Sequence, residues 1–131
     1  MKKYELTDET ITIEGHTLHR IKALRSFNDV KEGELGGFVE SEANLSHDGT
    51  AWVFDEAKVF EKATIFDDAW VFDEAKVFEK AMIFDDAWVF DEAKVFEKAT
   101  ICGDARVGGD AVVCGDAVVC GDEVIFGGRI E

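Results

Sequence analysis

The residues of this chain best suited to acid–base chemistry are its three histidines, His16, His19 and His47, because imidazole titrates near neutral pH. His47 stands beside Asp48, and this is the one pair that could supply a catalytic base with a carboxylate partner. No serine nucleophile motif or phosphate-binding loop accompanies the pair, and a histidine on a surface or in a cap needs no such role. We therefore expect no catalytic residues and a protein that is not an enzyme.

Three cysteines, Cys102, Cys114 and Cys120, could bind a metal or form a disulfide. Their number is odd and none belongs to a C-x-x-C pair, so neither a zinc site nor a redox site is indicated. The spacing between Cys102 and Cys120 returns in the repeats described below, where it equals three repeat lengths. We predict that these two stack as neighbours but remain thiols, because parallel side chains that point the same way strain a disulfide. No metal and no cofactor are expected.

Acidic side chains dominate the chain: 29 Asp and Glu residues stand against 14 Lys and Arg, a formal charge of -15. This excess argues against direct binding to nucleic acid or an anionic membrane, and it favours a basic partner or simply high solubility. No apolar run approaches the roughly 18 residues of a membrane span. The polar segment Tyr4–Glu9 stands where a signal peptide would have its apolar centre, so we expect a cytoplasmic protein.

A six-residue repeat must position most of these side chains. The segments 51–68, 69–86 and 87–104 each hold three hexapeptides, and the first two segments differ only at Thr64 and Met82. The six-residue period continues to Gly128, which gives thirteen hexapeptides without insertion or deletion. Such a period fits neither about 3.6 nor about 3.5 residues per turn, so an α-helix is excluded although Ala, Glu and Lys are abundant.

The first four residues of each hexapeptide alternate as a β-strand does, for example in Ala51–Phe54 (AWVF). The small residue and the β-branched residue share one face in every repeat, so this face should form the core. The fifth and sixth residues, such as Asp55-Glu56 or Gly103-Asp104, are polar or glycine and should form corners. Three strands and three corners use three hexapeptides and close one triangular coil.

The repeats also place an aliphatic residue four positions before a small one, as in the pairs Val53 and Ala57, Val59 and Ala63, and Ile65 and Ala69. This pattern resembles the hexapeptide-repeat left-handed parallel β-helix, and the resemblance implies that all-β fold together with its left hand. The segment LGGFVESEANLS, residues 35–46, also resembles uncharacterised phage and bacterial hexapeptide-repeat proteins.

Many members of the resembling family are acyltransferases, whose acyl-CoA site uses a histidine and a loop that protrudes from the coils at a trimer interface. The thirteen hexapeptides of this chain contain no histidine and no protruding loop. A hexapeptide-repeat acyltransferase is therefore the last of the functions that we expect.

The residues before the repeats predict a cap. Thr10–Ile13 and Thr17–Ile21 flank Glu14-Gly15-His16 in a hairpin-like pattern, which could cover the open first coil. We therefore divide the chain into an N-terminal β-hairpin-like cap, residues 1–36, and the β-helix, residues 37–131.

The β-helix should begin near Gly37, before the first regular hexapeptide. Gly37–Val39 and Ala43–Leu45 resemble two earlier strands of the coil. Ser46–Thr50 then forms a corner that is two residues too long.

Residues three hexapeptides apart should stack at about 4.8 Å and form ladders along the coils. A full coil such as 51–68 carries five acidic residues and two lysines, a net charge of -3. The predicted partner-binding residues are corner carboxylates and a tryptophan ladder: Asp55, Glu56, Asp67, Asp68, Asp73, Glu74, Asp85, Asp86, Asp91, Glu92, Trp52, Trp70 and Trp88. Arg106 should extend the tryptophan ladder as a cation–π partner of Trp88.

The function that this acidic rod favours is a non-enzymatic interaction. It could act as a phage-type decoy that mimics DNA and occupies the basic groove of a nucleic-acid-binding host protein. The alternative is a structural scaffold or self-assembly module whose near-identical coils reflect recent duplication or design. Stacked aromatic side chains can also stabilise sheets without binding anything.

The last coils change character and predict a homo-oligomer. Outward valines replace the lysines and aromatic residues there, and the predicted contact residues are Val112, Val118, Val124 and Ile130. The three residues after Gly128 are too few to cover the core residues Val113, Val119 and Ile125. We therefore predict a two-fold dimer joined through the C-terminal coils.

Overall fold

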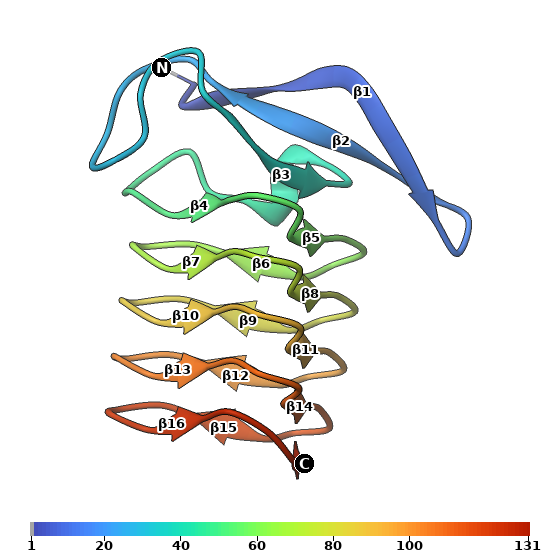
Figure 1. Ribbon diagram of the computed structural model, residues 1–131, viewed down its shortest axis with the longest axis vertical. Helices are drawn as coiled ribbons and strands as arrows, with labels where there is room; N and C mark the ends of the chain where they lie inside the picture. Colours follow the sequence, from blue (N-terminus) through green and yellow to red (C-terminus); the bar gives the residue numbers. More distant parts are fainter. Residues whose placement is uncertain (1) are drawn as a thin grey trace.

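The computed structural model describes residues 2–131, an all-β structure in which a β-hairpin covers one end of a parallel β-solenoid (Figure 1). The N-terminal elements are β1 (Tyr4–Ile13), β2 (His16–Ala23), β3 (Leu35–Val39) and the short 3-10 helix η1 (Glu42–Asn44). The strands of the coils are β4 (Trp52–Val53), β5 (Lys58–Val59), β6 (Thr64–Ile65), β7 (Trp70–Val71), β8 (Lys76–Val77), β9 (Met82–Ile83), β10 (Trp88–Val89), β11 (Lys94–Val95), β12 (Thr100–Ile101), β13 (Arg106–Val107), β14 (Val112–Val113), β15 (Val118–Val119), β16 (Val124–Ile125) and β17 (Arg129–Ile130). They form about five coils of about 18 residues each, as the repeats predict.

Three sheets run along the solenoid, in the strand orders β4-β7-β10-β13-β16, β6-β9-β12-β15 and β3-β5-β8-β11-β14-β17. Equivalent residues of successive coils lie opposite each other, so Trp52 pairs with Trp70, three hexapeptides further along the chain. Across the corner at residues 46–50 the step between paired residues is longer by two, because Phe38 pairs with Lys58. The prediction that this corner is two residues longer than the others is confirmed.

The core is the face that the repeats keep constant. The small residue and the aliphatic residue of every hexapeptide from Ala51 to Val119 are buried. They fill the interior between the three sheets and form one continuous apolar cluster. Burial of these residues is the main source of stability of the coils, at about 25 cal/mol per Å² of apolar surface removed from water.

The corners share one backbone conformation. The fifth residue of each of the first twelve hexapeptides has a positive φ, from 54° at Asp55 to 69° at Gly121. The eight corners from Asp55 to Glu97 hold Asp or Glu in this conformation, and the four from Gly103 to Gly121 hold glycine. A side chain in the left-handed region costs about 1–2 kcal/mol, so the acidic corners are strained and the glycine corners are not.

The hairpin of β1 and β2 turns at Glu14 and Gly15, both with positive φ, and Ile13 pairs with His16. It is the hairpin that the sequence predicts. β2 continues antiparallel onto β3, which pairs in parallel with β5, so the predicted boundary at residue 37 falls inside a strand shared by cap and coils.

Two side chains from the start of the chain close the first coil. The Tyr4 hydroxyl donates a hydrogen bond to the carbonyl of Leu45, at 2.5 Å, and the Lys3 ammonium donates to the carbonyl of Ala51, at 2.6 Å. Desolvation by burial, with the charge of Arg25 nearby, lowers the pKa of Lys3 to about 8. The cap therefore supplies polar partners to backbone that the first coil would otherwise leave open.

The C-terminal end differs from the sequence-based prediction. β17 pairs with β14, and Ile130 lies opposite Val113, so the last residues continue the coil. Val113 and Val119 are buried, and only Ile125 is partly exposed. The prediction that all three are left uncovered is therefore wrong. β17 covers Val113, and Val119 is buried inside its own coil.

Cys102 and Cys120 lie on adjacent coils, as their spacing predicts, but they form a disulfide. The prediction that they remain thiols is therefore wrong. Their Cα atoms are 4.5 Å apart, inside the range of about 4.4–6.8 Å that disulfides span, so stacked positions permit the bond without a shift of the backbone. Cys114 is a buried thiol.

Candidate binding face

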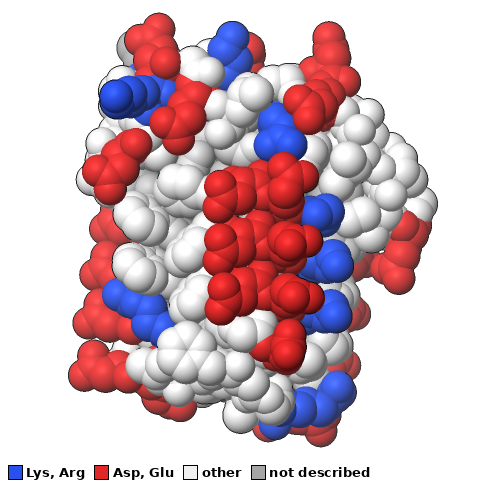
Figure 2. Space-filling model, viewed as in Figure 1, with Lys and Arg blue, Asp and Glu red and all other residues white. Residues whose placement is uncertain are grey.

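The sheet β4-β7-β10-β13-β16 presents Trp70 and Trp88 on its outer side and is named here the tryptophan face. Acidic corners run along both of its sides (Figure 2). The Asp-Glu edge consists of Asp55, Glu56, Asp73, Glu74, Asp91, Glu92 and Asp110, and the Asp-Asp edge consists of Asp67, Asp68, Asp85, Asp86 and Asp104. The structure thus gathers the predicted carboxylates on two edges of one face.

The third edge of the solenoid has a different charge pattern. The Glu-Lys edge consists of Glu61, Lys62, Glu79, Lys80, Glu97 and Lys98. In the coils 51–68 and 69–86, each acidic edge therefore carries two negative charges and the Glu-Lys edge carries none on balance. Carboxylates stacked about 4.8 Å apart repel by at most about 1 kcal/mol per pair in water, a cost that only the acidic edges bear in full.

The two carboxylates of an acidic corner have different surroundings. The first one accepts a hydrogen bond from the backbone of the next coil, as Asp55 does from the N–H of Asp73 and Asp73 does from the N–H of Asp91. The second one makes no side-chain hydrogen bond or ion pair within residues 2–131 at Glu74, Asp86 and Glu92. Nearer the cap, Glu56 pairs with Arg20 and Asp68 accepts hydrogen bonds from Thr50. The first carboxylate ties coils together, and the second is unpaired only in the coils away from the cap.

The tryptophan ladder holds two of its three predicted members. Trp70 and Trp88 stack with ring centroids 5.5 Å apart and planes 5° from parallel. The Arg106 guanidinium lies 4.0 Å from the centre of the Trp88 ring, so the predicted cation–π contact is confirmed.

Trp52 corrects the prediction, because it is fully buried and cannot meet a partner. Its ring packs edge-on against Tyr4 and Phe27 of the cap, at 6.1 and 5.2 Å between centroids. The register of the repeats placed Trp52 on the ladder. The sequence predicts a cap over the first coil, but it does not indicate that the cap buries this ring.

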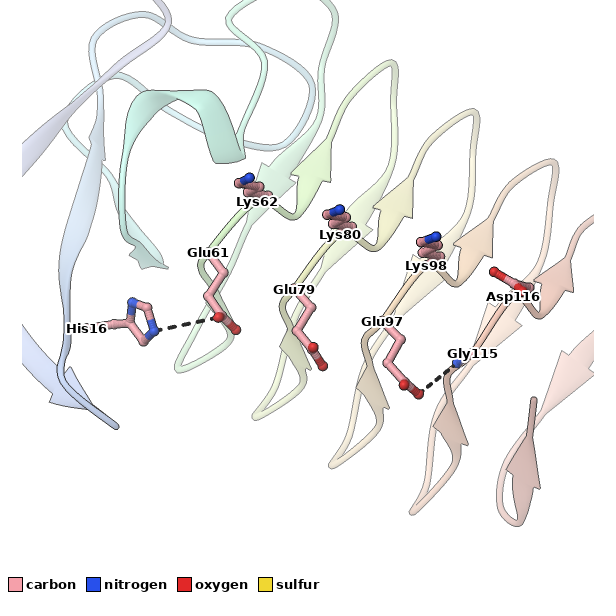
Figure 3. Close-up of a pocket in the computed structure, with 9 residues that line it drawn as sticks. All are labelled: His16, Glu61, Lys62, Glu79, Lys80, Glu97, Lys98, Gly115 and Asp116. Carbon is pink, nitrogen blue, oxygen red and sulfur yellow. Dashed lines mark hydrogen bonds and ion pairs between the residues drawn. The ribbon is translucent and has the colours of Figure 1, made fainter.

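A groove of about 830 Å³ follows the Glu-Lys edge and ends at His16, at the tip of the hairpin (Figure 3). The Nδ1 atom of His16 lies 2.9 Å from the Glu40 carboxylate, and its Nε2 atom lies 3.7 Å from Glu61. The hydrogen bond to Glu40 raises the pKa of His16 above its ordinary value. Sequence analysis missed this contact, because only the fold brings residues 16, 40 and 61 together.

The other histidines hold the cap. The Nδ1 atom of His47 accepts a hydrogen bond from the backbone N–H of Lys3, so its Nε2 carries the proton and donates to Glu42, at 2.8 Å. Its ring also stacks on Tyr4, at 4.2 Å between centroids. His19 contacts the carbonyl of Thr7 through Nδ1, at 3.0 Å. Both nitrogens of His47 are engaged with Lys3 and Glu42, and neither contacts Asp48.

The predicted oligomer contacts surround the last coils. Val112 is half-buried, whereas Val118, Val124 and Ile130 are exposed, at 63%, 57% and 37%. Phe126, which the prediction omitted, is 60% exposed beside them. Dimerisation through this surface stays a prediction, and light scattering on the intact chain tests it.

The described residues, 2–131, contain no cluster of three or more His, Cys, Asp and Glu side chains arranged to hold a metal ion. Within the same residues, no helix has the length and apolar character needed to cross a membrane.

Comparison with known proteins adds one relative. No family model matches the chain. The chain is 33% identical over 64 residues to the "Uncharacterized acetyltransferase YdcK" of Escherichia coli (strain K12). This match covers 43% of the chain and 20% of the relative, so the chain spans about a fifth of the length of that protein. The resemblance to phage proteins gains no support from these comparisons.

Proposed function

We propose that this protein is a non-enzymatic binding protein whose tryptophan face takes up a basic surface of another protein. The observation that carries the proposal is the segregation of charge: two edges bearing only carboxylates flank one face, while lysines neutralise the remaining edge. Charge arranged in this way gives the rod one preferred side for a cationic partner.

The spacing of the charges supports a partner that ordinarily binds DNA. In the coils 51–68 and 69–86, a net charge of -3 over a rise of about 4.8 Å is about 0.6 charges per Å. Duplex DNA carries one negative charge per about 1.7 Å, which is also about 0.6 per Å. A decoy that competes with DNA for a basic groove is therefore the form of the proposal that we favour.

The test compares two sets of three substitutions that remove the same charge. One variant carries Glu74→Gln, Asp86→Asn and Glu92→Gln on the acidic edges, and the control carries Glu61→Gln, Glu79→Gln and Glu97→Gln on the Glu-Lys edge. The first should bind lysine and arginine homopeptides roughly tenfold more weakly and with a flatter salt dependence, while the control stays close to the parent chain. Equal losses in both variants would show that net charge, and not the tryptophan face, determines binding.

A separate experiment tests whether the protein acts as a DNA-mimicking decoy. Proteins captured from a host lysate at low salt should be basic nucleic-acid-binding proteins, and duplex DNA should displace them from the rod. If DNA does not displace the captured proteins, a basic partner would still be supported, but the decoy hypothesis would be wrong.

A second candidate function is acetyl transfer, which the similarity to a protein named an acetyltransferase favours. The pair of His16 and Glu40 at the end of the groove on the Glu-Lys edge is the arrangement in this chain closest to a catalytic base. Calorimetric titration with acetyl-CoA, repeated on His16→Ala, tests it: binding lost in the variant would favour the enzyme.

A further inference from the structure

A second groove, of about 470 Å³, lies on the tryptophan face just below the cap. Trp70 and Trp88 line it, together with Thr50 and the carboxylates of Asp68, Asp86 and Asp104. Asn28, from a turn of the cap, lies at its upper end, and Arg106 lies at its lower end. The groove therefore combines two aromatic rings, several carboxylates and a boundary made by the cap.

The stacked rings of Trp70 and Trp88, called here the aromatic column, already bind one arginine side chain, that of Arg106. It stands opposite Trp88 in the register of the sheet, in the place that tryptophan occupies in the preceding coils. Its guanidinium stacks on the Trp88 ring, and Nη1 donates to the carbonyls of Asp86 and Asp104, each at 2.9 Å. The chain itself thus adds a guanidinium to the lower end of the column.

The upper end of the column lacks such a partner. Trp52 would stack on Trp70 if the ladder were regular, but its ring is turned under the cap. Within the described residues, Trp70 meets Trp88 face to face and touches Phe54 only at an angle of 68°. Because Trp52 packs under the cap, Trp70 is the last stacked ring of the column, and it lines the groove.

Carboxylates beside this position are available for ion pairing. The Oδ1 atom of Asp68 accepts hydrogen bonds from the N–H and the hydroxyl of Thr50, at 3.2 and 2.6 Å. Its Oδ2 atom and the carboxylate of Asp86 have no donor among residues 2–131. A cation on Trp70 would therefore find acceptors on the Asp-Asp edge without displacing an existing ion pair.

We propose that this groove receives an arginine side chain of the partner, whose guanidinium stacks on Trp70 and donates to the carboxylates of Asp68 and Asp86. The inference rests on the proposed function and specifies its partner. Guanidinium suits the groove better than ammonium, because it is planar, weakly hydrated and able to stack and to donate in a fork at once. The groove should therefore distinguish arginine from lysine, which the acidic edges alone do not.

The experiment uses two peptides of identical length, one carrying arginine and the other lysine at every charged position. Calorimetric titration of the full chain should give roughly tenfold tighter binding of the arginine peptide. Trp70→Leu should remove this preference, and Trp70→Phe should retain part of it, because a smaller ring still stacks. Phe96→Leu, which alters a stacked aromatic outside the groove, is the matched control and should retain the preference in full.

The NMR resonance of the Trp70 indole N–H gives a second readout, because a change in stability alone would not shift it on addition of one peptide and not the other. It should shift on addition of the arginine peptide and much less with the lysine peptide. Equal affinity for the two peptides, with salt-dependent binding intact, would overturn the arginine site and leave the proposed function standing. Failure of both peptides to bind would overturn the proposed function together with this inference.

Discussion

The coils before and after Cys102 make the same corner from different residues. Up to Glu97 the strained fifth position holds Asp or Glu, and from Gly103 onward it holds glycine, at nearly the same φ. The glycine coils show that the corner needs no carboxylate, and glycine adopts a positive φ without steric cost. The acidic coils therefore retain backbone strain at a position whose carboxylates, such as Asp55 and Asp73, hydrogen-bond to the next coil, together with like-charge repulsion that the glycine corners avoid.

The largest difference between the two regions should appear in their cores. Ile83 is fully buried in the acidic coils, whereas Ile125, in the last coil, is partly exposed. Ile83→Ala should lower the free energy of unfolding by about 3 kcal/mol, and Ile125→Ala by about 1 kcal/mol or less. Urea unfolding followed by circular dichroism measures both. Equal losses would mean that the last coil packs as tightly as the middle of the solenoid.

The disulfide is the next largest effect, and it belongs to the glycine coils. It closes a loop between Cys102 and Cys120, whose sequence separation is 18. Replacing Cys120 with Ser should lower the free energy of unfolding by about 2–3 kcal/mol, because the unfolded chain regains the freedom of that loop. Alkylation of the native chain without reductant should label neither cysteine, and mass spectrometry that finds both labelled would show them to be thiols.

The corners themselves should respond in opposite directions. The Glu79 side chain makes no hydrogen bond within residues 2–131, so Glu79→Gly should stabilise the chain by about 0.5–1 kcal/mol through loss of strain. Gly103→Ala should destabilise it by about 1 kcal/mol or more, since its new Cβ would lie 2.6 Å from the backbone nitrogen of Gly121. Thermal unfolding of both variants checks the signs. A stabilising Gly103→Ala would contradict the account of strain.

Much of the fold could be predicted from the sequence because the repeat imposes it. A six-residue period, a constant Ala and Val face and polar corners determined the strands, the core and the stacking register, down to Arg106 on Trp88. Local turn chemistry likewise predicted the hairpin at Glu14-Gly15.

What escaped prediction depends on contacts between distant segments. The cap buries Trp52 through residues far earlier in the chain, and His16 meets Glu40 and Glu61 only after the hairpin folds over the coils. The disulfide was missed for another reason, since stacked neighbours were assumed to be too strained to bond. Periodicity describes the coils, and it carries no information about the cap that covers them.

The smallest predicted effect concerns the join between cap and coils, where His16 is the titrating group. It faces Glu40 at the end of β3 and Glu61 on the Glu-Lys edge, with Glu14 on its own hairpin and the Phe60 ring 5.7 Å away. The hydrogen bond to Glu40 raises the pKa of His16 above 6.5. Desolvation is the largest single influence on Glu40 and raises its pKa, but the hydrogen bonds from His16 and from the backbone N–H of Glu61, together with the charge of His16, outweigh it and lower the pKa below 4.5.

Because the folded state binds the His16 proton more tightly, the contact should stabilise the chain fully below about pH 6.5 and lose its effect as the pH rises through the raised pKa. For Glu40 the sign is opposite, so the contribution of the pair should fade again as the pH falls below about 4.5. His16→Gln should flatten the change in thermal midpoint between about pH 6 and 8. His19→Gln is the control, because His19 contacts a backbone carbonyl and no carboxylate. A His16→Gln variant with the pH dependence of the parent chain would show that the hairpin is held to the coils by its backbone pairing and by Arg20, which bridges Glu9 and Glu56, and not by this contact.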